Sequence, residues 1–573
     1  MILCSQAEIA EYTGKGWWGA ETVLDWFEKD VRNAPDAVAL VDAPNRAEFT
    51  VGGPQRLTFA QAAEQADRLA AGLLEAGLVK DDILMVMLPN IVELPIVYLA
   101  AARIGLIVNP LAVQYRTHEL RQTIGQTEAK ALITTTNLSG FNLLDMARGL
   151  QPEFASLKTL VALGDSLPEG VLSLTDLLTK PRDLQPLRDY LARTTVTAND
   201  IFTICWTSGT EAEPKGVPRS HNHWIWIAYA SIDGCELEPG CNLLNPFPLV
   251  NMAGIGGMLI PWLILGGKLV MHQPFSLPVF LGQIPAEKIN YTVTPPALLN
   301  MLLMQPAILE KTDLSTIKNI GSGSAPLSPW MVTQYQEKYN KYVINIFGSN
   351  EGASFTSGPK ELPDPVERAQ YFPRFGVPEY KWASRVAAQM STKLVDPATK
   401  QVITRPRVPG EMAIKGPGIF SGYYKRPDLT AKAFDQDGYF YTGDLFEIGG
   451  QGTNLNTYRF VGRVKDVIIR GGNNISSEEI EGLVQGHPKV AEVAVVGYPD
   501  ERMGEKVCVV VAPKKDQTVT LEEIVDYLKT KDIAVYKLPE KLVLTQTLPR
   551  NPVGKILKRL LRDEMERKRE GIT

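Results

Sequence analysis

Two stretches of the sequence alternate between helical hydrophobic patterns and short apolar runs. In residues 57–136, "TFAQAAEQADRLAAGLLEAG" has apolar residues at helical spacing behind a capping threonine, and "DILMVML" is a short apolar run that ends at Pro89. "IVELPIVYLAAARIG" and "KALITT" repeat the order of helix and strand, and the same texture returns in residues 199–346. Such alternation predicts βα units around parallel sheets. We therefore expect an α/β fold whose large N-terminal region holds two α/β subdomains.

The remainder of the chain changes character twice. Residues 352–407 are rich in proline and charge, which favours irregular structure or a β-ribbon, and short strands with glycine turns follow in "GEMAIKG", "GYFYTGDLFEI" and "TYRFVGR". A unit of about a hundred residues begins near Asp466 and predicts a small α+β domain. We expect an N-terminal domain over 1–464 and a C-terminal domain over 465–573. The terminal "KRLLRDEMERKREG" is expected to form a solvated, charged helix.

Composition excludes several classes of protein. The 573 residues exceed a single compact core, and a net charge of −5 offers no basic surface for nucleic acid or anionic membranes. The five cysteines are scattered, which argues against a zinc site or a disulfide framework and favours the cytoplasm. The N-terminus lacks the basic start of a signal peptide. "AGIGGMLIPWLIL" is too short for a membrane span and predicts a buried core helix.

The stretch "WTSGTEAEPKG", residues 206–216, has the chemistry of a phosphate-binding loop. Small hydroxyl residues and bare backbone can surround anionic oxygens, and a lysine adds a point charge. The stretch follows an expected strand, where ligands sit in parallel sheets. It is not a Walker loop, and by itself it could equally be a glycine-rich turn. The candidate phosphate contacts are Thr207, Ser208, Gly209, Thr210 and Lys215.

Five further segments give this loop a context. They are "GSGSAPLS" (321–328), "NIFGSNEG" (345–352), "YFYTGDL" (439–445), "GRVKDVIIRGGNNISSEEIE" (462–481) and "LPRNPVGKILKR" (548–559). In this order and spacing the chain resembles the AMP-forming adenylating enzymes, a superfamily of acyl- and aryl-CoA synthetases, peptide-synthetase adenylation domains and beetle luciferases. The resemblance extends from about Trp18 to Lys558. In style the chain is most similar to the branch that activates aryl acids, such as dihydroxybenzoate ligases.

The resemblance implies a nucleotide site. The phosphate-loop residues would contact the β- and γ-phosphates of ATP, and Glu351 would bind Mg²⁺, a cation that prefers hard oxygen ligands. Lys555 would reach the α-phosphate and the attacking carboxylate. Adenine would lie between Ala325 and Pro326 on one face and Phe347 on the other, while Asp444 and Arg463 would hold the ribose. A structural salt bridge to Asp466 or a nearby acid is the rival interpretation of Arg463. Further nucleotide contacts would come from Ser324, Asn345 and Gly348.

The resemblance also implies a second half-reaction. The C-terminal domain would rotate after adenylation about a hinge at Lys465, so that Lys555 leaves the site. Gly472 would then line a tunnel for the thiol of coenzyme A, because a Cβ there would obstruct it. Two alternatives remain: a stand-alone ligase that loads the phosphopantetheine of a carrier protein, and a non-catalytic nucleotide-binding protein. The sequence leaves a homodimer open.

Three positions depart from the pattern of most relatives. Glu211-Ala212 replaces Thr-Gly, so Glu211 and Glu213 either face solvent or pair with a cation such as Arg219, or they weaken ATP binding by repulsion. Asn350 replaces a threonine that contacts the α-phosphate, and its amide can still donate. Asn251 replaces a histidine that helps to place the carboxylate.

The expected acyl pocket holds no charged side chain. Its residues are Asn251, Met252, Ala253, Ser322, Gly323 and Ser349, together with Ser324. We therefore expect a carboxylic acid with an uncharged tail, either a compact aromatic or alicyclic acid or a medium-chain one.

Overall fold

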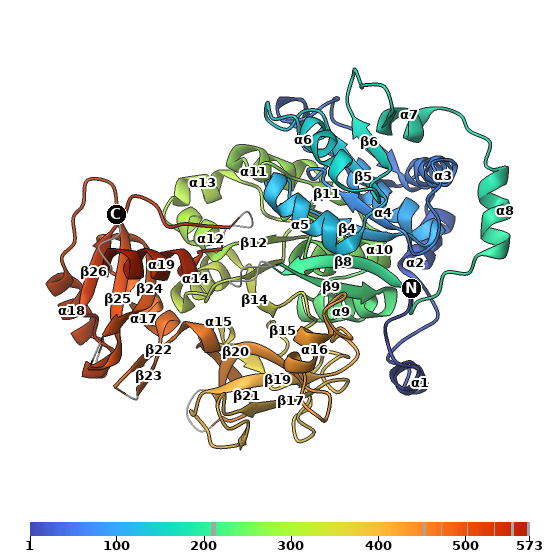
Figure 1. Ribbon diagram of the computed structural model, residues 1–573. Coiled ribbons are helices and arrows are strands. Elements are labelled where there is room, and N and C mark those ends of the chain that lie inside the picture. The colour runs from blue at the N-terminus through green and yellow to red at the C-terminus, as the bar shows by residue number, and fades with distance from the viewer. Residues whose placement is uncertain are drawn as a thin grey trace. The chain divides into compact units, whose positions relative to one another are not determined.

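The computed structural model describes residues 1–207, 214–450, 454–471, 473–500, 502–531, 533–551 and 555–569. The chain divides into two compact units (Figure 1). Unit 1 comprises Met1–Ser391 and Lys415–Gly438, and unit 2 comprises Thr392–Ile414 and Tyr439–Thr573. The predicted boundary at 464/465 stays a prediction. Among the helices within these ranges, none has the length and apolar character needed to cross a membrane.

Unit 1 contains two sheets with mainly parallel strands, as the alternating pattern predicts. Sheet 1 has the order β15 (Ser354–Ser357), β14 (Tyr342–Gly348), β13 (Asn319–Gly323), β12 (Tyr291–Thr294), β10 (Leu243–Asn245), β11 (Leu269–Met271), β1 (Val38–Val41) and β2 (Arg56–Thr58). Its six inner strands pair in parallel, and β15 and β2 close the two edges as antiparallel strands.

Sheet 2 is built in the same way. Its order is β7 (Val171–Ser173), β6 (Thr159–Leu163), β5 (Ala131–Thr135), β3 (Ile83–Val86), β4 (Ile107–Pro110), β8 (Ile201–Thr207) and β9 (Lys215–Ser220). All neighbours are parallel except β8 and β9, which form an antiparallel pair. The phosphate loop therefore joins the two strands of a hairpin, whereas a Walker loop would lead into a helix.

Side chains of each sheet are buried on both faces. Because successive side chains of a strand point to opposite faces, one strand contributes to two different cores. Leu84 and Val86 of β3 join the large core between the sheets, while Ile83 and Met85 join a second core on the other side. The core between the sheets includes side chains of α2 (Val23–Asn33), α3 (Phe59–Glu75), α4 (Glu93–Ile104), α9 (His221–Gly234) and α10 (Ile260–Leu265). The outer core of sheet 2 includes α5 (Thr117–Thr127) and α6 (Leu143–Leu150). That of sheet 1 includes α11 (Leu277–Ala286), α12 (Pro296–Leu303), α13 (Pro306–Lys311) and α14 (Pro329–Tyr339).

Local sequence signals set several of these element boundaries. Thr58 caps α3 with a complete capping box, and Gly105 ends α4 in the left-handed conformation. The apolar run after Ala253 is buried, as expected, but it forms a π-helical segment η3 (Met252–Leu259) that continues into α10. The helices α1 (Gln6–Gly14), α7 (Leu174–Thr179), α8 (Gln185–Arg193), α15 (Pro365–Gln370) and α16 (Pro427–Ala433) complete unit 1. Helix α15 lies in a stretch for which the sequence predicts no helix.

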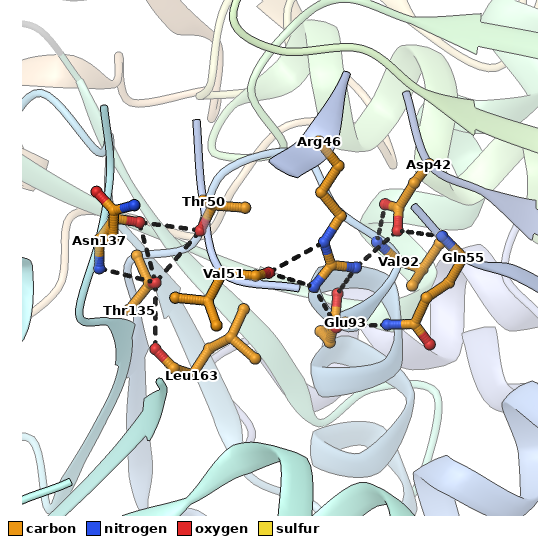
Figure 2. Close-up of polar contacts among 10 residues, drawn as sticks. All are labelled: Asp42, Arg46, Thr50, Val51, Gln55, Val92, Glu93, Thr135, Asn137 and Leu163. Carbon is orange, nitrogen blue, oxygen red and sulfur yellow. Dashed lines mark hydrogen bonds and ion pairs between the residues drawn. The ribbon is translucent and has the colours of Figure 1, made fainter. Parts of the chain in front are cut away.

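A buried polar network connects the end of β1 with the start of α4 in unit 1 (Figure 2). The Arg46 guanidinium donates to Asp42, which follows β1, at 2.6 Å and to Glu93, which begins α4, at 2.7 Å. It also donates to the carbonyl of Val51. Burial raises the pKa of Asp42, and the negative charge of Glu93 adds to the effect while Arg46 opposes it. One cation thus holds two carboxylates in the interior, where unpaired charges are strongly unfavourable.

Unit 2 begins with a sheet in the order β21 (Thr457–Arg463), β20 (Phe440–Gly449), β19 (Gly410–Lys415), β17 (Ser391–Val395) and β18 (Val402–Ile403). The pairs β21/β20, β20/β19 and β17/β18 are antiparallel. A second sheet has the order β23 (Asn473–Ser476), β22 (Val467–Arg470), β25 (Gly504–Pro513) and β24 (Val490–Asp500), with β26 (Lys541–Leu544) also on β25. The helices are α17 (Ser477–Val484), α18 (Leu521–Lys529) and α19 (Lys558–Arg569). Strands β19, β20 and β21 confirm the short strands expected in "GEMAIKG", "GYFYTGDLFEI" and "TYRFVGR". The elements that follow have the α+β composition expected after Asp466.

Helix α19 corrects one expectation. The sequence predicts a solvated charged helix, but Leu561 and Met565 are buried against β24 and β25. Lys558 is also buried, and its ammonium contacts Glu478 at 3.1 Å and Glu481 at 2.9 Å. Burial raises the pKa of Glu481 to about 7, and the negative charge of Glu478 adds to this while Lys558 opposes it. Charged residues dominate the composition of the helix, but two apolar residues four positions apart are enough to dock one face.

Candidate active site

The two ends of the phosphate loop lie opposite each other in unit 1. Thr207, the last residue of β8, pairs with Lys215, the first residue of β9. The Thr207 hydroxyl is buried and has no hydrogen-bond partner within the ranges given above, so it is available to an anionic ligand. Ser208, Gly209 and Thr210, and the acids Glu211 and Glu213, lie outside the described residues.

Arg219 has partners other than an acid. Its side chain is fully buried, and its Nη atoms donate to the backbone carbonyls of Asn350 at 3.0 Å, Gly418 at 2.9 Å and His223 at 3.2 Å. Burial lowers the pKa of Arg219 to about 10, so the side chain stays charged at neutral pH. The guanidinium therefore donates to backbone oxygens, and these bonds already occupy both Nη atoms of the predicted partner for the loop acids.

The predicted adenine-binding residues come from the ends of two neighbouring parallel strands. Ser324, Ala325 and Pro326 are exposed just after β13, and Phe347 is half-buried near the end of β14. Gly323 pairs with Ile346 of β14, and a Cβ at Gly323 would lie 2.1 Å from the Ile346 carbonyl oxygen. Glycine is thus required for the close approach that brings the two strand ends together.

Two residues of these segments have structural partners. Ser322 is fully buried and donates to the carbonyl of Thr294, which removes its hydroxyl from the expected acyl pocket. Asn345 is also buried, and its amide donates to the carbonyl of Ala369 at 3.0 Å. Gly348 is exposed at the end of β14.

The predicted magnesium ligand, Glu351, is held by a segment far away in the sequence. The Tyr423 hydroxyl donates to Glu351 Oε1 at 3.0 Å, and the amide of Phe420 donates to the Glu351 carbonyl at 2.9 Å. No group of three or more His, Cys, Asp or Glu side chains gathers as a metal site in the described part of the chain. A single carboxylate suits Mg²⁺, which usually keeps several waters and takes its other ligands from phosphates. Sequence reasoning missed Tyr423, and no local signal connects it to Glu351.

Asn251 and Asn350 both make backbone contacts in the predicted acyl region. Asn251 Oδ1 accepts from the amides of Ala253 at 3.1 Å and Gly254 at 3.3 Å, so this side chain caps the π-helical segment η3. Asn350 Oδ1 accepts from the amide of Met252 at 2.9 Å. Asn251, Met252 and Ala253 are half-buried. The half-buried Ser349 has a hydroxyl with no hydrogen-bond partner in the described ranges, so it can serve a ligand.

The predicted ribose-binding pair lies in unit 2. Asp444 of β20 is directly opposite Arg463 of β21, and Arg463 Nε lies 3.1 Å from Asp444 Oδ1. Asp444 is buried. Asp466, one acid considered for a structural salt bridge with Arg463, pairs with Arg562 at 3.0 Å. The salt bridge that the structure shows for Arg463 is the one with Asp444. The antiparallel register therefore brings together the two residues that the sequence assigns to one function.

Lys555 joins the same charged cluster. Two hydrogen bonds join Asn551 to Lys555. The Asn551 amide donates to the Lys555 carbonyl, and Asn551 Oδ1 accepts from the Lys555 amide, both at 2.8 Å. Although the Lys555 side chain keeps an exposed surface, surrounding protein atoms desolvate the ammonium and lower its pKa to about 7. Repulsion from Arg463 and Lys465 adds to this, and Asp444 and Asp466 oppose it.

The two remaining residues predicted for the second half-reaction are also in unit 2. Lys465 lies in a short 3-10 turn between β21 and β22. Desolvation and the neighbouring Arg463 lower its pKa, while Asp466 opposes them. Gly472 lies outside the described residues. The hinge at Lys465 stays a prediction.

Comparison with known proteins places this geometry in a family. The profile of the AMP-binding enzyme matches residues 27–424, and that of the AMP-binding enzyme C-terminal domain matches residues 479–555. The chain is 30% identical to the medium-chain fatty-acid–CoA ligase of Escherichia coli K12, over 98% of this chain and 93% of that protein. It is 27% identical to the 2,3-dihydroxybenzoate-AMP ligase of Bacillus subtilis, over 98% and 97% of the two chains.

A solved structure agrees with these sequence matches. The crystal structure of ATP-bound MatB from Rhodopseudomonas palustris has a TM-score of 0.79 and 25% identity, and the match covers 95% of this chain and 99% of that one. The chain therefore belongs to the AMP-binding enzyme family, within the AMP-forming adenylating superfamily. It is an enzyme of the AMP-forming acyl-CoA and aryl-acid ligase class, and the predicted α/β fold with a large and a small domain is confirmed.

Proposed function

We propose that this enzyme uses Mg·ATP to convert a carboxylic acid into an acyl-adenylate and then transfers the acyl group to coenzyme A. The observation that carries the proposal is the charged cluster of unit 2. The charges of Asp444 and Arg463, which form an ion pair, both act on the pKa of Lys555, so the residues assigned to the α-phosphate and the ribose are electrostatic neighbours.

The chemistry requires such a cluster. A carboxylate oxygen attacks the α-phosphorus, the bond from that phosphorus to the bridging oxygen of the β-phosphate breaks, and pyrophosphate leaves. Two anions must approach each other, and a cationic Lys555 would offset their repulsion in the transition state. Asp444 would accept hydrogen bonds from both ribose hydroxyls and so fix the direction of attack. Glu351, oriented by Tyr423, would hold Mg²⁺, which shields the phosphates.

The acyl transfer completes the reaction. The thiol of coenzyme A attacks the carbonyl carbon of the mixed anhydride, the bond to the phosphate oxygen breaks, and AMP leaves with the electron pair. We propose that a rotation about Lys465 separates the two steps. This rotation removes Lys555 from the site and brings in the segment that contains Gly472.

The substrate proposal follows from the chemistry of the pocket residues. Asn251, Met252, Ala253, Gly323 and Ser349 are uncharged, which favours an acid with an uncharged tail. The relatives support two classes, because one is named for a medium-chain fatty acid and another for a dihydroxybenzoate. We propose a medium-chain, compact aromatic or alicyclic acid.

Release of pyrophosphate tests the first step. Purified enzyme with Mg²⁺ and ATP is given a panel of short-chain, medium-chain, aromatic and alicyclic acids, and at least one acid of the proposed classes should release pyrophosphate. Release with none of them would refute the proposal. The acceptor is tested separately by offering coenzyme A and a phosphopantetheinylated carrier protein side by side, and faster thioester formation on the carrier would reassign the second step.

A further inference from the structure

The side chain of Asn350 connects two segments that the proposed function assigns to different ligands. Its Oδ1 accepts from the amide of Met252, a residue of the expected acyl pocket, at 2.9 Å. Its Nδ2 donates to the carbonyl of Trp206, immediately before the phosphate-loop residue Thr207, also at 2.9 Å. Both distances are those of well-formed hydrogen bonds. The carboxamide therefore bridges the acyl region and the strand that leads into the phosphate loop.

Buried contacts hold the main chain of Asn350 in place. Arg219, which is fully buried, donates through one Nη atom to the Asn350 carbonyl at 3.0 Å and through the other to the carbonyl of Gly418 at 2.9 Å. Gly352 has a φ of 112°, and a Cβ there would lie 1.9 Å from the Gly418 carbonyl oxygen. This close packing leaves the backbone beside Asn350 little room to move, so a shift of one bridged segment reaches the other through the side chain.

We propose that Asn350 is a positioning residue that couples occupancy of the acyl pocket to nucleotide binding through the end of β8. Asn350 uses its Oδ1 for Met252 and one N–H of its Nδ2 for Trp206, an arrangement that aligns two segments and leaves the other N–H for a ligand. The proposal rests on the function proposed above, because it requires that the two segments bind an acid and ATP. Hydrogen bonds of this kind can carry coupling when both ends belong to one packed network.

The two roles of Asn350 differ in a measurable way. If Asn350 bound the α-phosphate directly, removing its amide would weaken nucleotide binding equally with and without the acid. If Asn350 aligns the two segments, its removal would leave binding of the nucleotide alone nearly unchanged and would remove the extra affinity that the acid confers.

The experiment measures the dissociation constant of Mg·α,β-methylene-ATP for the full chain by calorimetry. The methylene group prevents pyrophosphate release, so a ternary complex with the acid persists. Each protein is titrated with and without saturating benzoate or octanoate, whichever releases pyrophosphate faster from ATP. We expect the acid to tighten nucleotide binding of the wild type by at least about fivefold, the lower end of typical couplings. In Asn350→Ala this factor should fall below about twofold, while the constant without acid changes by less than about twofold.

Two further variants make the result decisive. Asn319→Ala is the matched control, because the buried Asn319 side chain also donates to a backbone carbonyl, that of Cys235 at 2.8 Å, but contacts neither Met252 nor Trp206. It should keep the wild-type coupling. Asn350→Thr replaces Asn350→Ala if the alanine variant does not fold, and it should also lose coupling because a hydroxyl cannot span both contacts.

Three outcomes contradict the proposal. Unchanged coupling in the folded Asn350 variant would overturn it, as would equal weakening with and without the acid. A wild-type factor near one with an acid that the enzyme adenylates would also overturn it. Failure of every acid to release pyrophosphate would refute the proposed function itself, and the inference with it.

Discussion

From the lowered pKa of Lys555 and its proposed role, we predict that adenylation depends on pH in an unusual range. A lysine ordinarily loses its proton near pH 10.4. Desolvation and the charges of Arg463 and Lys465 bring the pKa of Lys555 to about 7 in the enzyme without ligands. The proposed role requires the protonated form, so activity in the first step should decline as the pH rises through this value.

The expected size follows from the fraction of protonated lysine. That fraction is about one half at pH 7, about one tenth at pH 8 and about one hundredth at pH 9, so kcat/KM for ATP should fall about tenfold per pH unit above 7. Because kcat/KM reports the free enzyme, it should show this pKa directly. Bound phosphates raise the pKa of a nearby ammonium, so kcat should be flatter over the same range.

The assay is carboxylate-dependent exchange of labelled pyrophosphate into ATP, which reports adenylation alone. Isolating this step matters because the thiolate of coenzyme A forms as the pH rises, which gives the second step the opposite dependence. Lys555→Arg should abolish the decline, since arginine stays charged throughout the range, even if its maximal rate is lower. Lys541→Arg, at a lysine of unit 2 that has no place in the proposed site, should keep the wild-type profile.

Two results would refute this reasoning. A kcat/KM that stays level up to pH 9 would show that the pKa of Lys555 is not lowered or that its charge is not needed. A decline that persists unchanged in Lys555→Arg would assign the titration to another group.

Three further predictions concern interactions that the structure adds to the sequence pattern. Arg46→Met should lower the free energy of unfolding by about 3–5 kcal/mol, because two buried carboxylates lose their cation. Arg32→Met, at an exposed ion pair, should change it by less than about 1 kcal/mol. Urea unfolding of the two variants measures both changes, and equal effects would contradict the buried network. Tyr423→Phe should raise the Mg²⁺ concentration for half-maximal pyrophosphate exchange by about tenfold, since the Glu351 carboxylate loses the hydrogen bond that the tyrosine hydroxyl donates. An unchanged magnesium dependence would remove Tyr423 from the site. Lys558→Met should speed hydrogen exchange of the amides of α19, because its two half-buried glutamate partners repel each other without it. Unchanged protection would show that the apolar face alone holds the helix.

Much of the fold follows from patterns that lie within a few residues of each other. The alternation in residues 57–136 correctly predicts α3, β3, α4 and β5, because burial on both faces of a parallel sheet requires continuous apolar strands. Capping residues such as Thr58 also mark helix starts locally. Helix α15 was missed because its six residues lie in a stretch whose proline and charge content suggests irregular structure.

The candidate site was predictable as a set of residue types, and its geometry was not. The order of the motifs singles out Glu351, Asp444, Arg463 and Lys555, and the register of β20 and β21 brings two of them into contact. Nothing near Asn350 in the sequence indicates that its amide would be used by Met252 and Trp206.

The sequence by itself determined the fold class, the order of the elements and the family, because periodicity, caps and motif spacing are read along the chain. The tertiary structure alone decided which side chains meet: the hydrogen bond from Tyr423 to Glu351, the bridge through Asn350 and the docking of α19. It also decided the surroundings of Lys555, where desolvation and the charge of Arg463 lower its pKa. Hydrogen-bond partners, desolvation and electrostatic repulsion depend on residues that are distant in sequence and close in space, and no local pattern records them.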